Sequence, residues 1–476
     1  SYRRYSFYAQ DRWDVRDNLQ LTFGIRYELP TFPDDPVENP LVFSTYGRHT
    51  SEVPTSNGLW NPRFGFNWDV TGDAATQVRG GVGLFSGRAP FVWIRNAYGN
   101  TGLEYVTFTC QAAQGVPAFS PDPNNQPRNC TNTTTAAPNN INLVDPDLKL
   151  PQVARYSLAI DRQLPLGLVG TIEGLYTQSV NDLLYRNLRI EEVAGTTVEG
   201  RQLYRNRNTP GLGQAIDVTN TDEGSAYSLT GQIQRPFRNN WDFSIAYTFS
   251  RSEDKGPLNN STANSNWSFN LHRDDPNKPE LTLSDNDVPH RIVGTTSYRL
   301  ELLRGLSTDL SLVYVGQSGK PYSFRYNGDI NGDGSTGNDL VFVPADASQV
   351  RFEPFRAPGT NGASDRGQLI TPAQSWNNLN AFIESTECLR EARGRIIQRN
   401  SCREPWSNRF DFRVAQNVSA LRGQNAQITL DILNFGNLLN REWGRSEFQN
   451  NQAFNLLTPT SAAAVNGQRQ YTAFTI

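Results

Sequence analysis

The stretch YNGDINGDGSTGNDLVF, residues 326–342, carries the side chains best suited to chemistry in this sequence. Oxygen-bearing side chains alternate in it and Gly334 follows, which is the order that opens a calcium-binding loop. Calcium takes about six to eight oxygens, and the glycine would allow the sharp bend that such a loop needs. The candidate ligands are Asp329, Asn331, Asp333, Ser335 through its carbonyl oxygen, and Asp339. We therefore expect calcium as the one candidate cofactor.

A plain polar turn is the competing interpretation of the same stretch. Asp, Asn and Gly favour turns without any metal, and the closing carboxylate of a calcium loop belongs where this sequence has Leu340, one place after Asp339. The flanking PYSFRY and LVFVP predict strands rather than helices, which excludes a helix-loop-helix calcium sensor. What remains is a calcium-bound or merely turn-rich corner of a β-hairpin.

Catalytic residues find little support in the sequence. The only histidines are His49, His272 and His290. His290 precedes a predicted strand in VPHRI, where we expect a structural hydrogen bond rather than general-base work. GQSGK, at 316–320, lacks the spacing of a nucleophile elbow or a phosphate loop. We therefore expect no enzyme.

The four cysteines fall into two local pairs, Cys110 with Cys130 and Cys388 with Cys402. An even count in polar, loop-like sequence predicts two disulfides and an oxidising compartment. Free thiols in a cytosolic protein are the alternative.

The bulk composition narrows the class of protein. A formal net charge of -3 gives no reason to expect a nucleic-acid partner. The mean hydropathy is -0.57, and no run reaches the roughly 20 apolar residues of a spanning helix. A β-barrel can still hide in so polar a chain, because only alternate residues of each strand face lipid.

Alternation of apolar and polar residues recurs along the chain, as in LQLTFGIRY, WNPRFGFNWDV and WDFSIAYTF. Each such segment is close to the roughly 9–11 residues that cross a bilayer at a tilt. The predicted strands lie near 4–14, 19–27, 60–70, 76–87, 153–162, 168–178, 225–235, 241–249, 290–301, 307–318, 408–418 and 426–434.

Short and long connections alternate strictly between these strands. The short turns are DVRDN, TGDAA, QLPLG, PFRNN, LLRGL and SALRGQ, and the long loops lie near 30–59, 88–152, 179–224, 252–289, 319–406 and 437–467. Outer-membrane barrels have this arrangement, with short periplasmic turns and long loops outside, whereas a sandwich or propeller has no reason for it. The sequence predicts an all-β transmembrane antiparallel barrel over residues 1–476, in contact with outer-membrane lipid and with extracellular long loops.

One long loop also has helical spacing, in WNNLNAFIESTECLREARGRII, where Leu379, Phe382 and Ile383 can share a face. We expect this short helix to pack over the barrel mouth, tied by the Cys388–Cys402 pair. A lid or docking surface and a stapled, protease-resistant loop are the two interpretations, and the entropy of loop closure favours the second.

Several segments together resemble the TonB-dependent outer-membrane receptors, and in particular their Oar-like branch. They are YSFYAQDRWDVRDNLQLTFGIRYE, WNPRFGFNWDV with QVRGGVGLFSGRAPFVWI, SDNDVPHRI, GQSGKPYSFRYNGDINGDGSTGNDLVFVP, CLREARGRIIQRNSCREPW and ITLDILNFGNLLNREWG. The resemblance runs over nearly the whole chain in one consistent order.

The resemblance implies a 22-stranded barrel that is filled by an N-terminal plug, energised by a TonB-type complex and used to move a bulky substrate. This sequence shows no plug and no TonB-contacting segment, and it starts without Met, so we expect a C-terminal portion with about half of the strands upstream of Ser1. It ends at QYTAFTI, where one further strand with a terminal aromatic is expected. The competing function is a non-transporting anchor that displays stapled loops to surface protein partners for adhesion or assembly.

Overall fold

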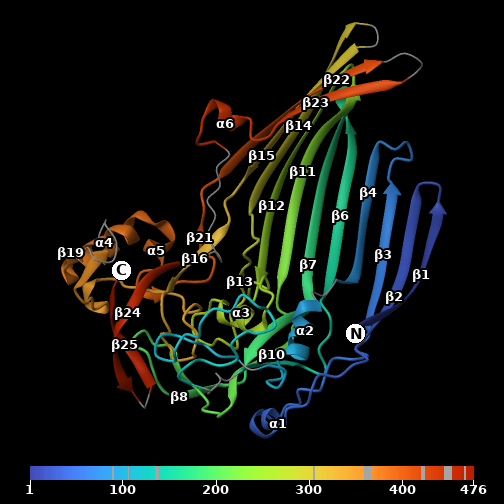
Figure 1. Ribbon diagram of the computed structural model, residues 1–476. Helices are drawn as coiled ribbons and strands as arrows, with labels where there is room; N and C mark the ends of the chain where they lie inside the picture. Colours follow the sequence, from blue (N-terminus) through green and yellow to red (C-terminus); the bar gives the residue numbers. More distant parts are fainter. Residues whose placement is uncertain are drawn as a thin grey trace.

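The computed structural model describes most of the chain and is shown in Figure 1. The described residues are 1–87, 91–105, 107–133, 139–303, 306–358, 366–419, 424–443, 453–465 and 468–475.

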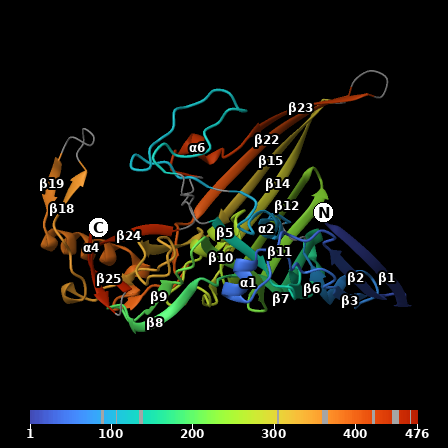
Figure 2. The same cartoon turned by 60° about the horizontal axis from the view of Figure 1, so that its bottom comes forward.

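Within the described residues, twelve antiparallel strands form the consecutive path of the main sheet, and three more strands, β5 (Asn139–Val144), β10 (Leu212–Thr221) and β13 (Thr282–Leu283), attach to it at the end of the long connections. Each of the twelve pairs with the next one along the path. They are β1 (Arg3–Arg16), β2 (Leu19–Thr31), β3 (Leu59–Asp69), β4 (Thr76–Ser86), β6 (Gln152–Leu164), β7 (Leu168–Asn187), β11 (Ser225–Arg238), β12 (Trp241–Asp254), β14 (His290–Leu303), β15 (Leu306–Gln317), β22 (Ser407–Ser419) and β23 (Asn425–Ile432). Each coincides with a predicted strand, so alternation located them correctly. The sheet is curved and, in the described part of the chain, open between β1 and β23 (Figures 1 and 2).

The two ends of the main sheet differ in the length of their connections, as predicted. Short turns gather at one end of the sheet, and the helices and long connections gather at the other (Figure 1). The turn between β11 and β12 has Asn239 and Asn240 at positive φ, 52° and 63°, which matches the right-handed twist of a tight hairpin. The predicted turns LLRGL and SALRGQ lie partly outside the described residues.

The two faces of the sheet have opposite chemistry. On one face, apolar side chains meet across strands, as in the ring pairs Tyr27–Trp60 at 4.5 Å and Tyr314–Phe410 at 4.8 Å between centroids. This face is exposed, and Ile245 keeps 55% of its accessible surface.

No helix in the described ranges is long and apolar enough to cross a membrane.

The opposite face is polar and held by side-chain pairs. Arg79 binds Asp161 on β6 at 3.0 Å and Glu173 on β7 at 2.9 Å, and Arg299 on β14 binds Asp309 on β15 at 2.6 Å. These pairs cross neighbouring strands on the same face.

The long connections fold into a packed layer, here called the loop layer, at the end of the sheet opposite the short turns. Its strands are β5 (Asn139–Val144), β8 (Ile190–Thr196), β9 (Gln202–Asn206), β10 (Leu212–Thr221), β13 (Thr282–Leu283), β16 (Pro321–Tyr326), β17 (Phe342–Val343), β18 (Phe355–Pro358), β19 (Arg366–Ile370), β20 (Arg395–Ile396), β21 (Cys402–Arg403), β24 (Ala453–Val465) and β25 (Gln468–Thr475). Its helices are α1 (Pro40–Tyr46), α2 (Phe91–Gly99), α3 (Ala263–Ser268), α4 (Pro372–Ser385), α5 (Glu387–Glu391) and the short 3-10 turn Ala347–Gln349. Outside this layer, α6 (Gly436–Leu439) lies against β22 beside the sheet, and the 3-10 turn Pro165–Gly167 forms the short turn between β6 and β7 (Figure 1).

The loop layer has hydrophobic cores of its own. The largest includes Phe324, Tyr326, Leu340, Leu379 and Ile383, all buried. A second core packs Trp267 of α3 against Tyr185 and Ile216. β7 extends past its predicted end at 178 because its last residues pair with β10 in this layer.

The predicted helix over 376–397 is confirmed in part, as α4 and α5 divided at Thr386. It starts four residues earlier than predicted, and Arg395–Ile396 at the end of the predicted segment forms the strand β20. Thr371 and Gln374 form a capping box at the start of α4, with Pro372 in its first turn, so the local sequence specifies where it begins. Leu379 and Ile383 are buried as predicted, whereas Phe382 remains 41% exposed and meets Phe324 edge-on.

The prediction of a simple hairpin around residues 326–342 was wrong in part. β16 coincides with PYSFRY, but only Phe342–Val343 of LVFVP forms a strand, β17, and it pairs with β20. β16 instead pairs with β21 and, in parallel, with β24. Backbone bonds from Tyr326 N to Asp339 O and from Val341 N to Phe324 O still close the loop.

The last part of the chain contains strands where the sequence predicts a long loop over residues 437–467. The last described strands, β24 and β25, pair with each other and lie in the loop layer rather than in the main sheet (Figure 2).

Candidate functional site

Residues 329–340, here called the aspartate loop, fold through a series of side-chain-to-backbone turns. Asp329 accepts hydrogen bonds from Gly332 N at 2.7 Å and Gly334 N at 2.9 Å, and Asp333 accepts from Ser335 N at 2.7 Å. Gly334 has φ +89°, a conformation that favours glycine. The sequence therefore specifies a tight loop with its carboxylates turned inward.

Two carboxylates of this loop are fully buried and a third, that of Asp329, is half-buried. Asp333 and Asp339 have no exposed surface. Burial, with repulsion from Asp333, raises the pKa of Asp329 and of Asp339 to about 7, and burial raises the pKa of Asp333 to about 6. Removal from water disfavours the charged form, so each site prefers either a proton or a compensating cation.

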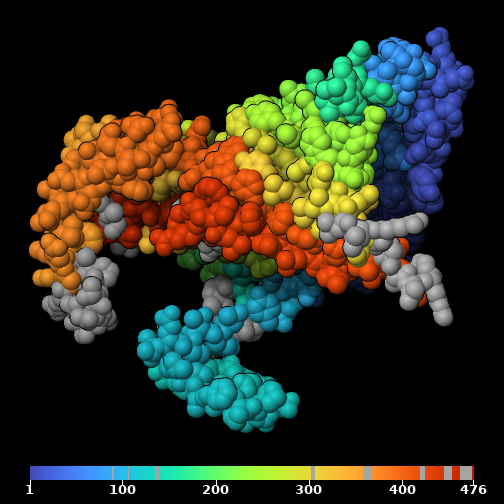
Figure 3. Space-filling view, turned by 90° about the horizontal axis from the view of Figure 1, so that it is seen from above, coloured from blue at the N-terminus to red at the C-terminus, as the bar shows by residue number. Residues whose placement is uncertain are grey.

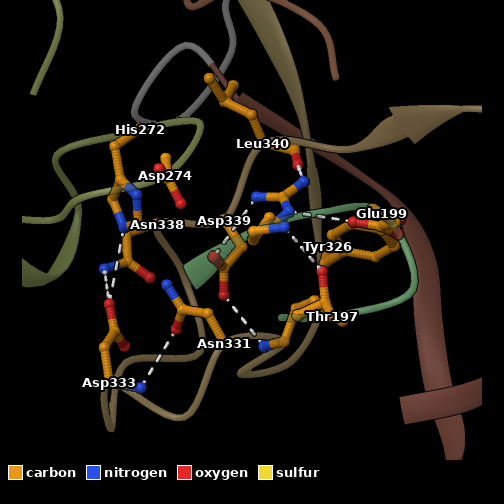
Figure 4. A network of polar contacts seen from close by, with 12 residues as sticks. Thr197, Glu199, His272, Asp274, Tyr326, Asn331, Asp333, Asn338, Asp339 and Leu340 are labelled. Atoms are coloured by element: carbon orange, nitrogen blue, oxygen red, sulfur yellow. Dashed lines mark hydrogen bonds and ion pairs between the residues drawn. The ribbon is translucent and has the colours of Figure 1, made fainter. Parts of the chain in front are cut away.

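Other segments of the loop layer enclose the aspartate loop. Asn331 O accepts from Tyr204 N of β9 at 2.7 Å. The Ser335 hydroxyl donates to Ser268 O at the end of α3 at 2.8 Å, and His272 N donates to Asn338 O at 3.0 Å. The aspartate loop is thus the junction at which three distant parts of the chain meet (Figure 4).

Arg201 provides one positive charge at this junction. Its side chain is fully buried, with Glu199 Oε2 at 2.9 Å and Asp339 Oδ1 at 3.5 Å, and it donates to the carbonyl oxygen of Leu340. Tyr326 donates its hydroxyl to Glu199 (Figure 4).

His272 does not add a second positive charge. Its Nε2 lies 3.5 Å from Asp333 Oδ2, but burial lowers its pKa, so the imidazole is neutral at neutral pH. Arg201 thus pairs with Glu199 and Asp339, while the carboxylates of Asp329 and Asp333 have no arginine or lysine partner among the described residues.

Asn338 is a second sign of a ligand site, because one of its polar atoms is buried without a partner in the described part of the chain. Its amide nitrogen donates to Asp333 Oδ2 at 2.8 Å, while its amide oxygen, in a side chain with no exposed surface, has no hydrogen-bond partner among the described residues. Figure 4 shows this amide among His272, Asn331, Asp333 and Asp339. A buried carbonyl oxygen without a donor is costly unless something else satisfies it.

No group of three or more His, Cys, Asp and Glu side chains in the described residues is arranged to hold a metal ion by itself. Asp339 is engaged with Arg201 and with Ile330 N at 3.0 Å. Any cation in the aspartate loop would therefore depend on asparagine and backbone oxygens in addition to carboxylates.

Both expected cysteine pairs form disulfides. Cys388–Cys402 joins α5 to β21 inside the largest core of the loop layer. Cys110–Cys130 closes a segment, coloured cyan in Figure 3, that projects away from the rest of the molecule.

The other histidines have structural contacts. His290 Nδ1 lies 2.7 Å from the Tyr247 hydroxyl, which confirms the predicted structural hydrogen bond. His49 Nδ1 lies 3.0 Å from Glu38 and stacks on Phe43.

The polar face of the main sheet carries a hollow of about 300 Å³. Gly65 and Gly81 form its floor, and Arg63 and Arg155 flank it. Neither arginine has an ion pair with a described residue, although Arg63 donates to Gln10 at 2.7 Å. A Cβ on Gly81 would meet the backbone oxygen of Phe64 at 2.9 Å, so the close packing of β3 and β4 favours glycine at this position.

Sequence reasoning missed Glu199, Arg201, His272 and Asn338. The first three lie far from the aspartate loop in sequence, and nothing local marks them. Asn338 is different, because it stands next to Asp339 in a loop already rich in oxygen-bearing side chains. Of the four residues, it is the one that the local sequence could have indicated as a further ligand.

Comparisons with known proteins give a family but no close relative. The sequence model of the family described as outer membrane beta barrel domain matches residues 1–471. A search of curated proteins found no match.

Solved structures that match include three bacterial outer-membrane proteins. The outer membrane transporter YddB from Escherichia coli is 14% identical, with 100% of this chain and 44% of that chain covered and a TM-score of 0.46. A mutant of the ferric enterobactin receptor PfeA from Pseudomonas aeruginosa is 10% identical, with 91% and 40% covered and a TM-score of 0.43. The siderophore receptor PirA from Acinetobacter baumannii is 9% identical, with 92% and 42% covered and a TM-score of 0.43. The chain thus spans about two fifths of the length of these structures.

Proposed function

The chain belongs to the outer membrane beta barrel domain family, and from this premise we propose that it forms part of the wall of a TonB-dependent transporter that moves a bulky substrate across the outer membrane. The family places the chain in the bacterial outer membrane. The Oar-like branch, suggested by the order of the sequence motifs, is part of the same proposal.

The observation that carries the proposal is the contrast between the two faces of the main sheet. Its exposed apolar face suits contact with lipid, and its polar face, cross-linked by pairs such as Arg79–Asp161, suits a wet interior. A barrel anchor has a polar interior as well, so the transport part of the proposal depends on the hollow lined by Arg63 and Arg155, which offers a polar cargo a contact on the inner wall.

The loop layer supports a receptor role at the opposite end from the short turns. Its packed cores and its disulfides present a defined surface rather than a set of independent loops. In the proposal this surface faces the cell exterior and meets the substrate first, and a plug and a TonB-type complex supply gating and energy from the other side.

The experiment compares two lesions in the native bacterium. One strain lacks the gene for this protein and another lacks the TonB-type energising protein, and both are profiled for depleted nutrients and for exported proteins. The proposal predicts at least one bulky compound or protein whose movement fails in both strains and returns when the gene is restored. An unchanged profile in the deletion strain, with lost adhesion or lost surface assembly instead, would replace the transporter with the anchor.

A further inference from the structure

The aspartate loop carries more negative charge than its surroundings neutralise. Arg201 is paired with Glu199 and Asp339, and within the described residues no arginine or lysine forms an ion pair with Asp329 or Asp333. Carboxylates held in a buried junction without a cationic partner are unfavourable unless protons or a further cation bind.

The oxygens around this charge have the chemistry that calcium prefers. Asp329 and Asp333 provide carboxylates, and Asn331 turns its amide oxygen back to Asp333 N at 3.1 Å, so the three alternate side chains point inward together. Calcium accepts carboxylate, amide and backbone oxygens in a flexible geometry, and so does not need three carboxylates in one cluster.

Asn338 is an independent indication of a ligand. Its amide oxygen is buried, lies among the other candidate ligands and has no donor within the described part of the chain. The same side chain holds Asp333 through its nitrogen. An oxygen in this position would be satisfied by a cation or by a water bound to one.

We propose that the aspartate loop binds one calcium ion and that the ion locks three segments of the loop layer together. Its ligands are the side-chain oxygens of Asp329, Asn331, Asp333 and Asn338 and the carbonyl oxygen of Ser335. Asp339 is not a ligand in this proposal: it binds Arg201 and adds its negative charge near the ion. The locked segments are the β8–β9 hairpin, through Tyr204 and Asn206, the stretch after α3, through Ser268 and His272, and the loop itself. The ion is thus a structural clamp on the receptor surface, and its presence does not depend on transport.

The test uses the detergent-solubilised protein after treatment with EDTA. Calcium binding is measured by calorimetry, and amide hydrogen exchange is followed in residues 199–206 and 326–343 with and without added calcium. We expect one saturable site and at least tenfold slower exchange of both segments when calcium is added. Asp329→Asn and Asp333→Asn should each weaken calcium binding at least tenfold while the main sheet stays protected.

Asp346→Asn is the matched control, because Asp346 also caps a turn in the loop layer but is exposed and lies outside the aspartate loop, six residues after Leu340. It should bind calcium as the unsubstituted protein does. Absence of a saturable site together with equal exchange in EDTA and calcium would overturn the proposal. Equal calcium affinity in Asp333→Asn and Asp346→Asn would overturn it as well, since the ion would then lie elsewhere.

Discussion

Arg201 Nη1 lies 3.5 Å from Asp339 Oδ1, and both side chains are fully buried although 138 residues separate them in the chain. This pair joins the β8–β9 hairpin to the aspartate loop. Its contacts with Glu199 and with the Leu340 carbonyl make Arg201 the centre of a polar network beside the apolar core that contains Tyr326 and Leu340. The loop layer is therefore held together by interactions between distant segments rather than by each loop separately.

Replacing Arg201 should loosen this network strongly. Arg201→Met keeps much of the side-chain volume but leaves Asp339 buried without its partner, which costs about 3–5 kcal/mol for pairs of this kind. We expect faster hydrogen exchange in residues 326–343, while the main sheet remains protected. Arg205→Met is the control from the same hairpin, because Arg205 is 59% exposed and its bond to Glu191 is a surface pair worth about 1 kcal/mol or less. Equal effects of the two substitutions would contradict the role given to Arg201.

The two disulfides should contribute differently to the loop layer. Cys388–Cys402 closes a short loop whose ends lie in the largest core, and its loss through a Cys388→Ser and Cys402→Ser double substitution should cost about 3 kcal/mol. We expect rapid proteolysis within residues 372–402. Loss of Cys110–Cys130 in the projecting segment should leave cleavage in that range unchanged. Comparable protection of 372–402 in both double variants and in the parent would refute this assignment.

The stability of the aspartate loop should fall with rising pH when calcium is removed. The folded pKa of Asp329 and Asp339 is about 7, well above the value of about 4 in an unfolded chain. The folded loop therefore holds more protons than the unfolded loop between these two values, and the free energy of unfolding decreases as pH rises through that window. The charged and titratable groups that face the loop include Glu199, Arg201, Tyr204, His272, Asp274, Asp275, Tyr326 and Arg325, which donates to the carbonyl oxygen of Gly337.

Urea titrations at pH 5, 6, 7 and 8 in EDTA, followed by tryptophan fluorescence, measure this dependence. The midpoint for the loop layer should decrease across the series. A midpoint that rises with pH would show that the carboxylates are stabilised in their charged form without any added cation.

Alternation in the sequence was sufficient to locate the twelve strands because each strand has one apolar and one polar face over its full length. The start of α4 is also specified by nearby residues, because Thr371 and Gln374 form a capping box there. The loop layer could not be predicted in this way. β16 pairs in parallel with β24, whose partner residues are about 130 positions away, and Leu340 and Val341 are buried by segments that no local pattern connects to them.

The candidate site also has a part that the local sequence predicts and a part that it does not. The aspartate loop was recognisable because its spacing is local, whereas Arg201 and His272 enter from other loops. Arg201 contributes charge and His272 contributes a backbone hydrogen bond to Asn338, and no local sequence pattern at either position indicates that its side chain is buried.

The central claim is that the apolar face of the main sheet contacts lipid and the polar face lines the interior of a barrel. Single cysteine substitutions from Phe243 to Thr248 in β12, each carrying a nitroxide label, test it in reconstituted membranes, because the native cysteines are held in disulfides. We predict that Ile245→Cys and the other odd positions collide with dissolved oxygen and not with a water-soluble nickel complex, and that Ala246→Cys and the other even positions show far less contact with oxygen. Loss of this alternation, or nickel access at the odd positions, would contradict the account.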